Sequence, residues 1–204
     1  MKLVKWAQAQ SLILPFVKDC PWPMGEICLQ QAAREFFERS YTWRVWTDDL
    51  YTIAGLAEYD LFVGKGAEVS SVIDAIIGGR KVQCFTQNDW GYMQTDKSAT
   101  SGVSWFDSQL HINPIPSVDE LPIKALVSLR PDLNIEGLPE TQWEYITKIV
   151  LGALARIYGA TDKPYSNPGE ATKYELMFQS AYFRERSKAE KSGFTRSRVV
   201  GHYL

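Results

Sequence analysis

The two histidines are the first residues to consider for chemistry, because imidazole readily moves protons and binds metals near neutral pH. His111 lies in the segment LHINPIP, and His202 is the third residue from the C-terminal end. Neither has a His, Glu or Cys at the spacing that a metal site requires. We therefore expect no metal site, and we predict that His111 is a strand histidine rather than a catalytic one.

The chain also lacks the short motifs that build enzyme active sites. It contains no G-x-S-x-G, no Walker A and no G-x-G-x-x-G, and the GKG at residues 64–66 is interpreted as a turn. The adjacent Asp48 and Asp49 have the chemistry to bind a cation, but such a pair is more typical of a solvated strand end. We predict that the protein is not an enzyme, that it has no catalytic, cofactor-binding or metal-binding residues, and that it needs no cofactor.

Length and composition indicate an ordinary globular protein. The 204 residues suit one domain or two small packed layers, and 45% of them are apolar while 23% are charged. The formal charge of −2 gives no overall attraction to nucleic acid or to anionic membranes. Any partner must therefore recognise a local surface.

The cysteines and the N-terminal sequence indicate whether the protein is exported to an oxidising compartment. Cys20, Cys28 and Cys84 form no C-x-x-C pair, which favours reduced thiols over a zinc site or a disulfide framework. An Ala-Gln-Ala precedes the short apolar run at residues 12–16, which is the reverse of the order in a signal peptide. No segment reaches the roughly 18 apolar residues that span a bilayer. We expect a soluble protein that is not exported and has no membrane partner.

An amphipathic helix is predicted over residues 22–41. Prolines at 21 and 23 suit its entrance, and polar residues occupy one side of it. The opposite side carries apolar or small residues at helical spacing: Leu29, Ala32, Ala33, Phe36, Phe37 and Ser40.

From residue 43 onward the sequence has the pattern of a β module, with short runs of β-branched and aromatic residues between turn residues. Gly78 and Gly79 form a good hairpin turn because both accept positive φ, and Asp107 with Ser108 suggests a second turn. Such spacing indicates a small antiparallel sandwich or open barrel. The predicted strands are 44–51, 61–62, 69–77, 81–86, 102–106, 109–112 and 123–130.

Two more helices are predicted after the β module, one leading to Gly159 as its C-cap and one beginning at Asn167 as its N-cap. Each has a main apolar stripe, made of Trp143, Ile146, Val150, Ala153, Leu154 and Ile157 in the first and of Ala171, Tyr174, Phe178, Ala181, Tyr182 and Glu185 in the second. Residues off these stripes include Tyr145, Ile149, Gly152, Leu176, Met177 and Phe183. Two interpretations stay open: these residues pack against a neighbouring subunit, or they fill an internal three-helix core.

The C-terminal segment 193–204 is too short to fold alone. It belongs to a C-terminal stretch, residues 183–204, with a local excess of about four positive charges, and it carries apolar residues, which in a tail usually dock on a partner. The alternative is a frayed basic end. The predicted docking residues are Phe194, Arg196, Arg198, Val199 and Tyr203.

These elements together predict an α+β fold. It consists of a helical bundle, made of one N-terminal helix and a C-terminal helical hairpin, with an inserted antiparallel β module and an extended C-terminal tail. The predicted domains are the helical bundle at 1–42 and 131–192, the β-sandwich or barrel-like module at 43–130, and the docking tail at 193–204.

Several stretches of the chain, in order, resemble the head-to-tail adaptor (connector) proteins of tailed bacteriophages, including the tail tubular adaptors of short-tailed phages. The first are LPFVKDCPWP and AAREFFERSYTWR, followed by AEVSSVIDAIIGGRKV and LHINPIPS. They continue with ALVSLRPDLNIEGLPE and with GALARIYGATDKPYSNPGEATKYELMFQSAYFRERSKAE, which is the most specific block. The resemblance lies in the order of these segments, since none of them alone is diagnostic.

The resemblance implies a structural virion protein at the head-tail interface, made in the host cytoplasm. Such a protein forms a homo-oligomeric ring of about twelve copies beneath the portal protein, with tail proteins on the other side. Double-stranded DNA passes through the lumen without sequence-specific binding, and the C-terminal tail docks on the portal. Since basic side chains would hold phosphates by counterion release, we expect a lumen of neutral or negative charge.

Two rival functions remain. One is another structural role in the virion, such as a tail terminator or completion protein. The other is a virion-associated hydrolase, which needs a cleft of polar residues that the sequence does not supply.

Overall fold

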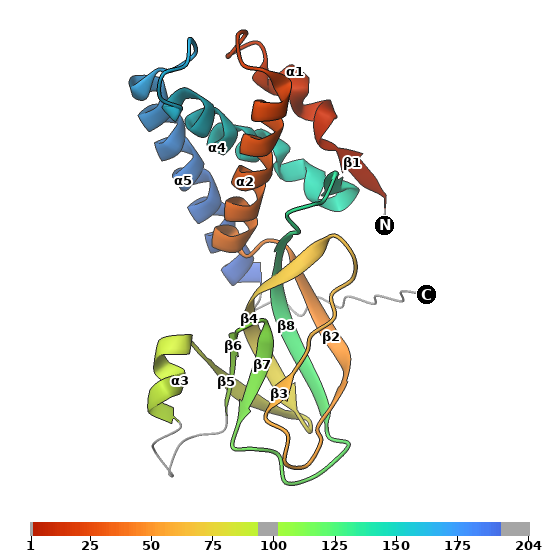
Figure 1. Ribbon diagram of the computed structural model, residues 1–204. Coiled ribbons are helices and arrows are strands. Elements are labelled where there is room, and N and C mark those ends of the chain that lie inside the picture. The colour runs from red at the N-terminus through yellow and green to blue at the C-terminus, as the bar shows by residue number, and fades with distance from the viewer. Residues whose placement is uncertain (1, 94–101, 193–204) are drawn as a thin grey trace. The chain divides into compact units, whose positions relative to one another are not determined.

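The computed structural model describes residues 2–93 and 102–192 (Figure 1). The chain forms two compact units. The helical unit combines the described residues up to Thr42 with those from Leu133 onward, and the β unit comprises Trp43–Asp132. The β unit is therefore inserted between two halves of the helical unit.

The helical unit is built on three long helices: α2 (Trp22–Ser40), α4 (Ile146–Gly159) and α5 (Pro168–Ser192). Shorter elements complete it: β1 (Leu3–Lys5), the 3-10 helix η1 (Trp6–Ala9), α1 (Gln10–Ile13), β9 (Gly137–Pro139) and the 3-10 helix η2 (Glu140–Tyr145). Over the described residues, no helix carries an apolar stretch long enough to cross a bilayer.

Helix α2 has the ends and the buried face that the sequence predicts. Pro21 is extended and precedes the first turn, and Tyr41 caps the C-terminal end in the left-handed region at φ 52° while its N–H bonds to the Phe37 carbonyl. The predicted apolar stripe from Leu29 to Ser40 is buried at every position. The prediction for this helix is confirmed.

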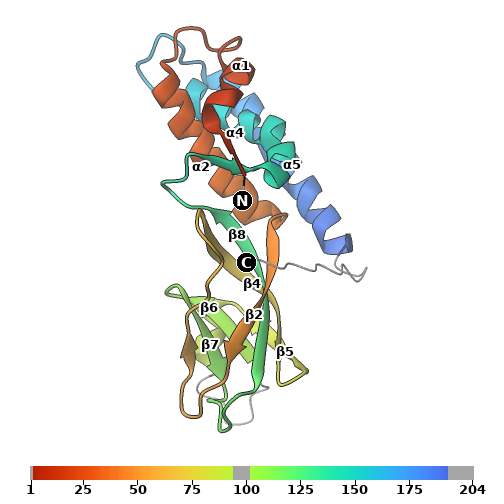
Figure 2. The same cartoon turned by 90° about the vertical axis from the view of Figure 1, so that its right-hand side faces the viewer.

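Helices α4 and α5 form a hairpin that packs on α2 (Figures 1 and 2). Helix α5 starts as predicted, because the Asn167 side-chain oxygen accepts a hydrogen bond from the Glu170 N–H at 3.2 Å and Pro168 takes the first helical position. Gly159 is the last residue of α4 rather than its cap, since the extended Ala160 follows it.

The pairing of β1 with β9 was not predicted. The two strands are antiparallel, with Val4 opposite Leu138, and the fully buried Trp6 donates its indole N–H to the Ile135 carbonyl at 2.8 Å. Gly137 permits this pairing, because a Cβ there would lie 2.1 Å from the Val4 carbonyl oxygen. The N-terminal segment is thereby fixed to the residues that lead into η2.

The β unit contains one mixed sheet of seven strands in the order β2-β8-β4-β5-β6-β7-β3. Figure 1 labels these strands. Its core includes the buried Tyr59, Ala75, Leu110 and Ile123. The strands are β2 (Arg44–Tyr51), β3 (Glu58–Tyr59), β4 (Ala67–Ile77), β5 (Arg80–Phe85), β6 (Gly102–Phe106), β7 (Gln109–Asn113) and β8 (Pro122–Pro131).

Both predicted turns are confirmed. Gly78 and Gly79 have φ of 57° and 78° between the paired Ile77 and Arg80. Asp107 and Ser108 also adopt positive φ and join β6 to β7. One predicted strand is wrong, because residues 61–62 are irregular and the short strand β3 lies earlier, at Glu58–Tyr59.

The predicted fold class, a helical bundle with an inserted antiparallel β module, is wrong. The sheet is mixed, since β6 runs parallel to β5, and it is too large to be a minor insertion. Parallel neighbours require a crossover connection, and the connection here includes helix α3 (Gln87–Met93), which was not predicted from the sequence. Helices are therefore present in both units.

Candidate functional site

The exposed side of helix α5 is the strongest candidate for a binding surface in the helical unit. Leu176, Met177 and Phe183 expose 62%, 45% and 56% of their surface. Leu176 and Phe183 are seven residues apart, so they lie on one stripe of the helix. We call these three residues the α5 apolar surface.

The predicted subunit-contact residues of α4, and Tyr145 at the end of η2, pack within the helical unit. Ile149 is fully buried, and Gly152 lies so close to the Phe178 ring of α5 that a Cβ would stand 2.8 Å from it. Tyr145 packs on the rings of Phe36 and Phe37 at centroid distances of 5.4 and 5.9 Å.

The structure therefore removes Ile149 and Gly152 from the predicted inter-subunit face. The physical reason is that α4 packs against both α2 and α5, so that residues off its main stripe still face a neighbouring helix. Burial, with the nearby Glu144 and Glu185 carboxylates, raises the pKa of the Tyr145 hydroxyl to about 12. Tyr145 is thus a neutral, half-buried core residue at physiological pH.

Arg156 fixes the spacing of the three long helices. Its guanidinium donates to the Gly152 carbonyl at 2.8 Å and to the Glu35 carboxylate of α2, and it lies 5.7 Å from the centre of the Phe178 ring. One α4 side chain therefore contacts both neighbouring helices, which holds the α5 apolar surface on a rigid support.

A buried carboxylate anchors the C-terminal half of α5. Glu185 is 6% exposed and accepts hydrogen bonds or ion pairs from Lys188 at 2.8 Å and Lys148 of α4 at 3.2 Å. Burial alone would raise the pKa of Glu185, but the two ammonium groups more than offset that effect and lower the pKa. Glu185 is therefore a charged structural residue.

A basic stripe runs beside the α5 apolar surface. Lys173, Arg184, Lys188 and Lys191 recur at helical spacing on the exposed side of the helix. Lys173 pairs with Glu170 and Lys188 pairs with Glu185, so part of this charge is neutralised within the helix. The exposed side of α5 therefore combines apolar contact area with positive charge.

A shallow hollow of about 350 Å³ adjoins Leu176 between α4 and α5. Ala155 and Ala171 form its apolar wall, and Arg156 and Glu175 form its polar edge. Because Ala155 and Ala171 line this hollow next to Leu176, the exposed apolar area there is larger than that of the Leu176 side chain alone.

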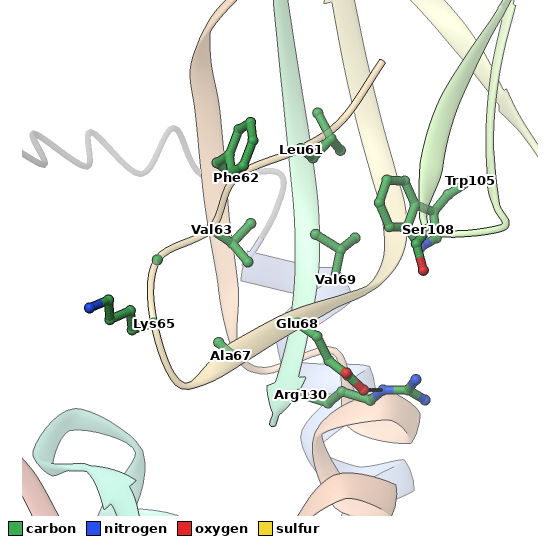
Figure 3. A pocket seen from close by; sticks show the side chains of 11 residues that line it. Leu61, Phe62, Val63, Lys65, Ala67, Glu68, Val69, Trp105, Ser108 and Arg130 are labelled. Carbon is green, nitrogen blue, oxygen red and sulfur yellow. Dashed lines mark hydrogen bonds and ion pairs between the residues drawn. The ribbon is translucent and has the colours of Figure 1, made fainter. Parts of the chain in front are cut away.

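The β unit has a larger pocket, of about 530 Å³ (Figure 3). Leu61, Phe62 and Val63 line one side and Trp105 lies across from them, as Figure 3 shows. The only carboxylate among the lining residues belongs to Glu68, and the Arg130 guanidinium binds it at 2.6 Å. The lining has the chemistry to hold an apolar group.

His111 lies in strand β7, as predicted, and its surroundings are aromatic. The imidazole stacks on Phe106 at a centroid distance of 3.6 Å, with Trp90 at 6.3 Å. Its Nδ1 is 3.7 Å from the Glu58 carboxylate, and its buried Nε2 makes no hydrogen bond to the described residues. This arrangement packs the ring and presents no nucleophile beside it among those neighbours.

The remaining predicted residues are placed as follows. Asp48 and Asp49 lie within β2, where its register with β8 shifts between Thr47 and Leu50. The predicted docking residues of the tail, namely Phe194, Arg196, Arg198, Val199 and Tyr203, and also His202, lie outside the described residues. Among the residues that the structure describes, no group of three His, Cys, Asp or Glu side chains could hold a metal ion.

Sequence reasoning missed a second exposed apolar surface, at one end of the β unit. It is formed by two loops, 52–57 and 114–121, and the residues that flank them. The signal was the segment NPIPSVDELP, in which Ile115, Val118 and Leu121 occur in a proline-rich loop without a strand pattern.

The comparison with protein families matches almost the entire chain. A family model described as SU10 adaptor protein matches residues 7–201. No curated protein matches the chain.

Proposed function

Because this chain belongs to the SU10 adaptor protein family of bacteriophages, we propose that it forms a ring that joins the portal vertex to the tail of the virion. The family membership confirms the resemblance seen in the sequence. An adaptor of this kind is a structural protein, and its ring gives passage to double-stranded DNA.

The α5 apolar surface is the observation that supports ring formation. Three large apolar side chains of α5 remain at least 45% exposed, while Phe178, Tyr182 and Glu185 of the same helix are buried. Large exposed apolar side chains on the outer side of a rigid helix are typical of a protein interface. In a closed ring each subunit presents two different complementary surfaces, and we assign the α5 apolar surface to one of them.

The C-terminal segment 193–204 is our candidate for the portal contact. It contains two arginines and no Asp or Glu, together with Phe194, Val199 and Tyr203. A short segment with both apolar and basic residues offers a partner apolar contacts and ion pairs. About twelve copies would give the portal a ring of such contacts.

Charge supports a conduit for DNA. Residues 43–132 contain seven Lys or Arg against twelve Asp or Glu, and the whole chain has a formal charge of −2. A lumen of neutral or negative charge releases DNA readily, because its wall offers few basic side chains to neutralise phosphates and to release the counterions condensed on the DNA. Purified rings should therefore bind duplex DNA weakly at physiological salt, and tight binding would contradict this lumen.

Assembly on purified portal tests the ring directly. The chain with Leu176→Ser and Phe183→Ser should fold normally and should lose ring formation, as measured by electron microscopy and sedimentation. Ile27→Ser is the matched control, because Ile27 is an apolar residue of α2 with 50% exposure outside the proposed contact. Rings that form equally well from both variants would contradict the proposal, and binding to tail-tube protein instead of portal would favour a tail terminator.

A further inference from the structure

The two loops at one end of the β unit expose large apolar side chains in one place. The loops run side by side in both views, and hydrogen bonds join them (Figures 1 and 2). Their exposed residues are Tyr51, Ile53, Leu56, Ile115, Val118 and Leu121, with exposures of 38–57%. We call this set the loop apolar surface.

Thr52 holds the two loops together. Its N–H donates to the Leu121 carbonyl at 2.9 Å, and its hydroxyl donates to the Val118 carbonyl at 2.7 Å while accepting from the Leu121 N–H at 3.0 Å. Its carbonyl accepts from the Glu120 N–H at 2.9 Å. With 2% exposure, Thr52 is a buried polar residue that satisfies the backbone of the opposite loop.

Further hydrogen bonds order the tip of the first loop. The Ala54 N–H donates to the Asp119 carboxylate at 2.6 Å, and the Gly55 N–H donates to the Pro116 carbonyl at 2.9 Å. The Tyr59 hydroxyl accepts from the Ile53 N–H at 3.1 Å. The apolar side chains are therefore presented by an ordered backbone.

An ordered apolar loop pair has the properties of a docking site. Rigid presentation lowers the entropy that binding must overcome. A connection that served only to link strands would gain nothing from exposing six large apolar side chains to water.

The charges around the loop apolar surface select the partner. Asp119 and Glu120 belong to the second loop, and Glu58 exposes 57% of its side chain next to the first. Lys124 is the nearest basic residue along the chain to the second loop. Nucleic acid, an anionic membrane, or the same surface on a second copy would each place negative charge against negative charge.

We propose that the loop apolar surface docks a tail protein of the virion that presents an aliphatic contact area with a Lys or Arg rim. This inference rests on the proposed function, in which the ring binds tail proteins as well as the portal. The apolar centre supplies the affinity, and the acidic rim supplies the orientation and the choice of partner.

Attachment of purified phage tails to portal–adaptor rings tests this inference. The variant with Ile115→Ser and Val118→Ser should reduce tail attachment at least about tenfold, as expected for interface residues that contribute strongly to binding. Glu120→Lys should also weaken attachment, and the loss should be larger at low salt than at high salt. Leu133→Ser is the control, because Leu133 is 66% exposed but lies outside this surface.

The outcomes separate this inference from the proposed function. Loss of tail attachment with unchanged unfolding and unchanged portal binding supports the inference. Tail attachment within twofold of the parent chain for both loop variants overturns it, as does a gain of attachment on deleting residues 193–204, which would identify the protein's own basic tail as the occupant. Failure of the parent chain to form rings on portal would instead overturn the proposed function.

Discussion

Helices α4 and α5 carry similar sequence patterns, but their additional apolar residues differ in exposure to solvent. Both have apolar residues beyond one stripe, and from the sequence both sets are candidates for a subunit contact. In the structure Ile149 and Gly152 of α4 are buried, whereas Leu176 and Phe183 of α5 are more than half exposed. Helix α4 packs against α1, α2 and α5, while α5 packs against α2 and α4 and leaves its outer side open.

The difference shows that the position of a helix in the packing order decides what an additional apolar face means. In a helix that neighbours surround, such a face completes the core. In a helix at the edge of the unit, the same face remains available to another chain. The four predictions that follow test this contrast.

The largest expected effect comes from α4. Ile149→Ala removes a fully buried side chain, and we expect it to lower the free energy of unfolding by about 3 kcal/mol through lost burial and a residual cavity. Denaturant unfolding measures this change. A loss of less than about 1 kcal/mol would mean that the α4 face is not a true core surface.

Gly152→Ala tests the close contact between α4 and α5. The new methyl group would lie 2.8 Å from the Phe178 ring, so the helices must separate or the ring must move, at a cost of about 1–3 kcal/mol. Gly159→Ala is the matched control in the same helix, since its Cβ would meet the Ala171 Cβ at 3.8 Å, an ordinary contact. Equal thermal midpoints for the two variants would contradict the close packing.

The pH dependence of stability tests the anchor of α5. The pKa of Glu185 is lowered in the folded protein, so its stabilising effect is present above the unfolded pKa of about 4.3 and is lost as the pH falls through the folded pKa. Glu185→Gln should therefore reduce stability at pH 7 and lose that difference in acid. Glu190→Gln is the control, because the Glu190 side chain is 56% exposed. A deficit for Glu185→Gln that persists unchanged at pH 2 would show that its charge is not responsible.

The smallest effect belongs to the α5 apolar surface. Leu176→Ala and Phe183→Ala should each change the free energy of unfolding of the isolated chain by less than about 0.5 kcal/mol, because both side chains already contact water. A loss comparable with that of Ile149→Ala would show that α5 is a core helix and would remove the basis of the proposed ring.

Much of the local structure could be predicted from the sequence. The ends of β2 and β6, the Gly78–Gly79 turn and the Asn167 cap follow from residue types with strong local preferences. Three features could not be predicted in this way. The pairing of β1 with β9 joins segments more than 130 residues apart. Strand β6 runs parallel to β5 because the connection between them crosses over through α3. The burial of Ile149 depends on the packing of three helices.

The residues of the candidate site were predicted only in part, because their exposure also depends on contacts between segments that are distant in the sequence. Pattern alone identifies residues off a main stripe, but it does not say which of them a neighbouring helix covers. The loop apolar surface was missed because its residues follow neither a helical nor a strand period, and because hydrogen bonds between segments distant in the sequence, chiefly those of Thr52, bring its two loops together.

Electron cryomicroscopy of the chain bound to its portal is the most direct test of the central claim, that the outer side of α5 is a contact between copies. We predict a closed ring in which Leu176 and Phe183 are buried against the adjacent subunit, while Ile149 keeps its contacts within one chain. A particle in which the α5 apolar surface faces solvent in every copy would contradict the account.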